Sequence, residues 1–195
     1  METTIKRKRM MALIAAFAGL TWAGVVGLVF LLDTGDYSDF WFPARIVTYI
    51  LLLIAPALTF MPLGRALGLR FYGYWSVFSW AAFGFVFAFL TPDPAKGRNE
   101  NLSALILLLV CFFAVLISLF LPICYAVGLN LFAKAYRPAR YDLRRATREA
   151  VFLSMYCILI AFLQLLGSLT WLYAVMLFLI VLVVELLILS RGRAR

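Results

Sequence analysis

The longest apolar block of the sequence runs from residue 150 to residue 189 and contains a single charge, Glu185. As one helix, this block of about forty residues would be about 60 Å long, because a helix rises about 1.5 Å per residue. The hydrocarbon core of a bilayer is only about 30 Å thick. The block therefore predicts two membrane-spanning helices in a tight hairpin, with Gly167 and Ser168 as turn residues near its middle.

The amino-acid composition indicates the same class of protein. Hydrophobic residues make up 66% of the 195 residues and charged residues only 14%, and the mean hydropathy is +1.01. A soluble domain is closer to half apolar and a quarter charged, and a chain of this length cannot bury so much apolar surface in one core. We predict an all-α integral membrane protein whose apolar surface is covered by lipid.

Apolar segments along the whole chain predict six transmembrane helices. They comprise residues 10–32, 46–63, 72–90 and 102–132 and the two halves of the block at 150–189. These spans form one predicted transmembrane domain over residues 10–190, with a basic N-terminus at 1–9 and a basic tail at 191–195. Pro56 and Pro122 predict kinks in the second and fourth spans.

Basic residues gather on one side of this six-span topology. Of the 18 lysines and arginines, 15 lie in the N-terminus, the second connection, the connection at about 133–149, or the C-terminal tail, and the exceptions are Arg45, Lys96 and Arg98. The positive-inside rule places these segments and both chain ends in the cytoplasm. We expect the plasma (inner) membrane of a prokaryote. A signal peptide is the alternative for the first segment, but its apolar run is long, and this favours an uncleaved span.

Glu185 lies near the predicted cytoplasmic end of the hairpin. If the chain turns at Gly167 and Ser168, residues equally far from the turn lie at one depth, which places Glu185 within a helical turn of Arg148. An intramembrane carboxylate costs little free energy when paired and about a few kcal/mol when unpaired. We predict a structural ion pair between Glu185 and Arg148. A protonatable role of Glu185 in transport is the alternative.

Small residues recur four apart along the first span. They are Ala12, Ala15, Ala16, Gly19 and Ala23. Such residues form a flat face that another helix can approach closely. The partner is either another helix of the same chain, which is the plainer interpretation, or a different subunit.

The connection at about residues 133–149 carries four arginines at spacings of three, four and four, namely Arg137, Arg140, Arg144 and Arg148. On a helix they would share one face. We expect this face to meet anionic lipid headgroups, each arginine contributing about 1 kcal/mol at most, or a cytoplasmic partner. Its plainer role is to determine topology. Nucleic acid is not an expected partner, because no base-reading module accompanies the charges.

The residues needed for catalysis are scarce. The chain has no histidine, and Cys111, Cys124 and Cys157 lie in apolar runs without a CxxC spacing. We therefore expect no catalytic, metal or cofactor site and a non-enzymatic protein.

Two functional hypotheses follow. The small size, the lack of a soluble domain and the small-residue face favour an accessory or scaffold subunit of a larger membrane complex. The alternative is a small-molecule carrier, or the substrate-binding component of a transporter. Six spans with both ends inside and a small-residue first helix are similar in architecture to the substrate-binding subunits of energy-coupling-factor importers. This resemblance implies a carrier by fold-level analogy and covers no binding motif.

Overall fold

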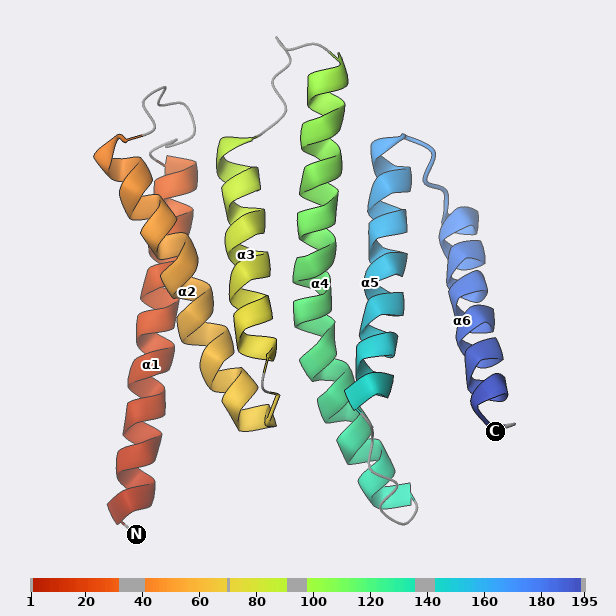
Figure 1. Cartoon of the computed structure of the whole chain (residues 1–195), viewed down its shortest axis with the longest axis horizontal. Helices are drawn as coiled ribbons and strands as arrows, with labels where there is room; N and C mark the ends of the chain where they lie inside the picture. Colours follow the sequence, from red (N-terminus) through yellow and green to blue (C-terminus); the bar gives the residue numbers. More distant parts are fainter. Residues whose placement is uncertain (1, 32–40, 70, 91–97, 136–142, 194–195) are drawn as a thin grey trace. The chain divides into compact units, whose positions relative to one another are not determined.

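The computed structural model describes residues 2–31, 41–69, 71–90, 98–135 and 143–193. Within these ranges the structure is all-helical, as the sequence predicts (Figure 1). The helices are α1 (Glu2–Val26), α2 (Pro43–Leu67), α3 (Tyr72–Phe89), α4 (Arg98–Ala135), α5 (Leu143–Leu165) and α6 (Trp171–Arg193), and the π-helix η1 (Gly27–Leu31) continues α1.

The helices have the length and the exposed apolar surface of a membrane protein. Among the described residues, five segments are long and apolar enough to cross a bilayer: Ala12–Leu31, Pro43–Leu67, Leu102–Leu129, Leu143–Leu165 and Trp171–Ile188. At most 28% of the residues in any of them are buried, so lipid has to cover most of their side chains. Helix α3 does not belong to this set, because tyrosine, tryptophan and serine occupy much of its first half.

The predicted connection at 133–149 is shorter in the structure. Helix α4 continues to Ala135, and α5 already begins at Leu143. Lysine and arginine are good helix formers. The end of α4 and the start of α5 therefore extend beyond the apolar segments from which their bounds were predicted.

The chain divides into two compact units, Met1–Val115 and Leu116–Arg195, and the division falls within α4. The predicted transmembrane domain over residues 10–190 includes parts of both units. Hydropathy identifies residues that suit lipid, but it carries no information on which helices group together, so this division was not accessible from the sequence.

In the first unit, glycines allow α2 and α3 to pack closely. A Cβ atom added to Gly73 would lie 3.2 Å from Met61 Cα, and one added to Gly64 would lie 3.2 Å from the backbone nitrogen of Gly73. Both neighbours are backbone atoms, which cannot rotate away. The two helices therefore approach so closely that a larger residue at either position would require the neighbouring backbone to shift by a few tenths of an ångström.

Helix α1 packs against α2 and α3 through one face. The indole Nε1 of Trp22 donates a hydrogen bond to Thr59 Oγ1 at 3.1 Å, and the Trp22 ring meets Trp80 edge to face with centroids 5.2 Å apart. Val25 joins Leu52 and neighbouring residues of α2 in a buried cluster. Indole hydrogen bonds and aromatic pairs of this kind fix the rotation of α1 about its own axis.

In the second unit, α5 and α6 form a hairpin that turns at Gly167 and Ser168. Gly167 has a φ of +66°, a left-handed conformation that favours glycine. Its N–H donates to the carbonyl of Gln164 at 3.0 Å, and the N–H of Ser168 donates to that of Leu163 at 3.2 Å. These two bonds form a Schellman motif, which ends α5 and satisfies two of its last carbonyl groups.

Candidate functional site

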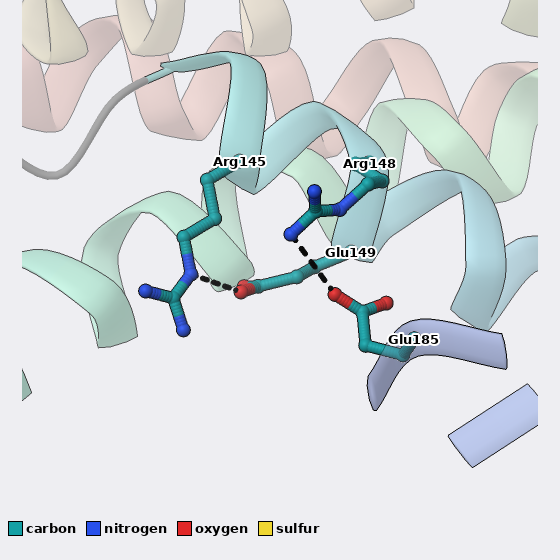
Figure 2. Close-up of polar contacts among 4 residues, drawn as sticks. All are labelled: Arg145, Arg148, Glu149 and Glu185. Atoms are coloured by element: carbon teal, nitrogen blue, oxygen red, sulfur yellow. Dashed lines mark hydrogen bonds and ion pairs between the residues drawn. The ribbon is translucent and has the colours of Figure 1, made fainter. Parts of the chain in front are cut away.

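The hairpin brings Arg148 of α5 and Glu185 of α6 together. Arg148 Nη2 lies 3.3 Å from Glu185 Oε1 (Figure 2). The two side chains are 31% and 21% exposed, respectively. Arg148 and Glu185 are about equally far along the chain from the turn at Gly167, and the hairpin places them side by side.

A second ion pair lies beside the first and was not identified from the sequence. Arg145 Nε donates a hydrogen bond to Glu149 Oε1 at 2.9 Å, both residues belonging to α5 (Figure 2). Residues four apart on a helix are neighbours, and this spacing is the signal that could have revealed the pair. The site thus contains two cations and two carboxylates, and its formal charge sums to zero.

The Arg148–Glu185 pair is close but not well bonded. Among the described residues, neither Arg148 Nε nor Glu185 Oε1 has a hydrogen-bond partner, although both atoms are buried. The contact between Nη2 and Oε1 therefore has the distance of an ion pair without hydrogen-bond geometry. An unmade bond at a buried charged group costs about 1–3 kcal/mol, so the pair holds the hairpin together while keeping unused bonding capacity.

A cavity of about 400 Å³ opens beside these charges in the second unit. Arg145, Glu149 and Glu185 form its charged part. Its apolar part consists of Phe152, Leu153, Phe178, Val181, Leu182 and Leu186 from α5 and α6. A cavity with one ionic wall and one apolar wall matches a ligand that has a polar and an apolar end.

Two further residues complete the wall. Cys124 of α4 lines the cavity, whereas the sequence analysis assigned it no role. Tyr156 also lines it, and its hydroxyl donates to the carbonyl of Ala174 at 3.4 Å. The Tyr156 ring meets Phe178 edge to face with centroids 5.8 Å apart, a contact that joins α5 to α6.

The described residues contain no cluster of three or more His, Cys, Asp or Glu side chains that could hold a metal ion. Cys111, Cys124 and Cys157 are free thiols of intermediate exposure. The residues that line the cavity offer ion pairing, hydrogen bonding and apolar contact.

The small-residue face of α1 is exposed. Ala12, Ala15, Ala16, Gly19 and Ala23 are all exposed, and among the described residues no heavy atom other than those of the chain neighbours and the nearby backbone of α1 lies within 4 Å of where a Cβ on Gly19 would be. Packing within the first unit uses another face, which includes the buried side chains of Ala18 and Val25. Within the described part of the first unit, α2 and α3 leave the small-residue face uncovered.

The predicted basic face is visible only in part. Arg137 and Arg140 lie outside the described residues, whereas Arg144 and Arg148 lie one turn apart in the first turns of α5. Arg148 is directed at Glu185. One member of the predicted lipid-binding face thus also serves the ion pair, so the two predicted sites share a residue.

Comparisons of this chain with models of protein families, with curated proteins and with solved structures find no match. Its function has to be inferred from the residues themselves. Two features stand out for that purpose: the exposed small-residue face of α1 and the charged cavity of the second unit.

Proposed function

We propose that this protein is a non-enzymatic accessory or scaffold subunit of a membrane complex. In this proposal, α1 binds a transmembrane helix of another chain through the small-residue face, and the charged cavity is not needed for assembly. We further propose that α3 crosses the membrane as well, which makes six spans in total. Both chain ends then lie in the cytoplasm, and the membrane is a prokaryotic plasma membrane. Helix α3 has 18 residues and a length of about 27 Å, close to the thickness of the hydrocarbon core.

The observation that supports this proposal is the contrast between the two faces of α1. One face contributes Trp22 and Val25 to contacts with α2 and α3, while the small-residue face has open space at Gly19. Lipid tails are as apolar as leucine, so small side chains gain little from facing lipid. They do allow another helix backbone to approach closely, which increases van der Waals contact.

The test is gentle extraction from native membranes followed by native mass spectrometry. We expect another protein chain at fixed stoichiometry. Gly19→Trp should release that chain, because the indole would occupy the helix contact. Phe17→Trp is the matched control: Phe17 is exposed on another side of α1, and this variant should retain the partner.

Two outcomes would contradict the proposal. The first is extraction of a lone chain under conditions that preserve known complexes. The second comes from cross-linking a Gly19→Cys variant in the membrane. Products that join position 19 only to other residues of the same chain would mean that the small-residue face packs internally.

A small-molecule carrier is the second candidate function, and the cavity of about 400 Å³ beside four charged side chains favours it. Carriers keep charged groups within the membrane to recognise polar substrates. A lone chain that retains a bound small molecule through extraction would make this the better explanation.

A further inference from the structure

The cavity of the second unit differs from the surfaces expected of a simple scaffold. It places charged side chains from α5 and α6 directly beside six apolar ones, within helices that are long and apolar enough to cross a bilayer. Ionic groups next to such a wall are costly unless they are paired, and charged groups at membrane depth often mark a functional site. The cavity is independent of the small-residue face, so its role does not depend on the proposed subunit function.

The charge balance of the cavity restricts its ligand. Arg145 and Glu149 line the cavity as an ion pair, and Glu185 also lines it and pairs with Arg148, which is not itself a lining residue, so the four charges cancel. A ligand with a net charge would leave one charge uncompensated in surroundings of low dielectric constant. A zwitterion instead lets its anionic group face an arginine and its cationic group face a carboxylate, and the sum stays at zero.

The donors and acceptors of the cavity indicate the chemistry of the two charged groups. The guanidinium of Arg145 lines the cavity beside its bond to Glu149, and guanidinium groups suit phosphate oxygens. Glu185 lines the cavity, and its Oε1 accepts no hydrogen bond from the described residues. The ion pair of Glu185 with Arg148 is 3.3 Å long and lacks a hydrogen bond, so the carboxylate keeps acceptor capacity that suits an ammonium group, which supplies several N–H donors.

A primary ammonium fits better than a quaternary one. A quaternary ammonium has no N–H to donate and is usually held by an aromatic cage. Here the rings of Tyr156 and Phe178 contact each other edge to face instead of enclosing a cation. The Tyr156 hydroxyl is already directed at the carbonyl of Ala174.

The apolar wall indicates that the zwitterion belongs to a lipid. Phe152, Phe178 and Leu182 line the cavity together with the charged residues, and apolar side chains in this position can contact the upper part of acyl chains. The charges lie in the first turns of α5 and towards the end of α6. Lipid headgroups are found at this level of a membrane-spanning helix.

We propose that the cavity binds one phospholipid whose headgroup carries a phosphate and a primary ammonium, as phosphoethanolamine does. Arg145 holds the phosphate, and Glu185, kept in place by Arg148, accepts hydrogen bonds from the ammonium. The apolar wall covers the beginning of the acyl chains. About 400 Å³ suits a headgroup and the adjoining methylene groups rather than a whole lipid.

Lipid titrations of the detergent-solubilised full chain, followed by native mass spectrometry, test this proposal. The probes are phosphatidylethanolamine, phosphatidylcholine and phosphatidylglycerol with identical acyl chains, together with free phosphoethanolamine. We expect one phosphatidylethanolamine per chain, bound about tenfold more tightly than the other two lipids, since one charge-assisted hydrogen bond separates them. Free phosphoethanolamine should bind far more weakly, because it lacks the acyl chains.

Variants separate recognition from folding. Glu185→Gln should weaken phosphatidylethanolamine binding about tenfold and abolish the preference over phosphatidylcholine. Leu182→Trp should also weaken binding, by filling the apolar part while leaving all four charges in place. Ile180→Trp is the control, because Ile180 is exposed on the same helix and does not line the cavity. Circular dichroism checks that each variant is folded.

Four results would overturn the proposal. Equal binding of phosphatidylethanolamine and phosphatidylcholine would show that the ammonium is not recognised. A preference for phosphatidylglycerol would mean that the cavity selects net negative charge. If free phosphoethanolamine bound as tightly as the lipid, or if folded Leu182→Trp bound the lipid unchanged, the apolar wall would have no part in binding.

Discussion

Neutralising Glu185 tests whether the ion pair to Arg148 stabilises the hairpin. At the observed 3.3 Å, the attraction is about 5 kcal/mol at an effective dielectric constant of about 20. Loss of hydration offsets much of it, and both groups are still partly exposed. We expect Glu185→Gln to lower the free energy of unfolding by about 1–2 kcal/mol, between the values for exposed and buried pairs.

A double-mutant cycle isolates the pair. Glu185→Gln, Arg148→Gln and the double variant are unfolded reversibly in mixed micelles, and helix content is followed by circular dichroism. The double variant should lose about 1–2 kcal/mol less than the sum of the single losses, because each single change leaves one charge without its partner. Glu185→Gln combined with Arg65→Gln is the control, since Arg65 lies on α2 in the other unit and the two losses should add.

A coupling free energy below about 0.3 kcal/mol between Glu185 and Arg148 would refute this reasoning, because independent sites already scatter by that amount. Unchanged stability together with a lost transport or binding activity would instead assign Glu185 to function alone. Both results are distinguishable from the expected one, since the cycle measures stability and not activity.

Two further predictions address the packing of the first unit and its topology. Gly73→Ala should destabilise the protein by about 1–3 kcal/mol, because the added Cβ meets the backbone of Met61 at 3.2 Å; Gly19→Ala, with open space around it, should cost nothing. Equal thermal stability of the two variants would contradict this account of close packing. If α3 spans the membrane, a reporter that is active only in the cytoplasm should be active at both chain ends and inactive when it is inserted between residues 91 and 97. Chain ends on opposite sides of the membrane would mean that α3 does not span it.

Particular residues show how far the sequence could predict the candidate site. The Arg148–Glu185 contact followed from the position of the turn alone. Both helices rise by the same distance per residue, so residues equally far from Gly167 in the sequence lie at the same depth. The Arg145–Glu149 pair could have been found from its spacing of four. By contrast, the part of Cys124 in the cavity wall depends on how α4 lies beside α5 and α6, and no local pattern encodes that position.

The small-residue face of α1 shows a second limit on what the sequence can predict. Its members could be read from their spacing, and the helix that carries them could be placed from its apolar length. The sequence could not determine whether another helix covers them. That depends on which side of α1 meets α2, and the contacts of Trp22 and Val25 decide it in favour of another face.

By itself, the sequence determined the helical membrane class, the approximate position of every helix, and the turn of the last hairpin. Each of these depends on the hydropathy and local conformation of consecutive residues, which are properties of short segments. Only the tertiary structure decided the division into two units, the open face of α1 and the cavity beside Glu185. These features arise from contacts between residues far apart in the chain, and in lipid such contacts depend on side-chain shape rather than on hydrophobicity, which is nearly uniform along the helices.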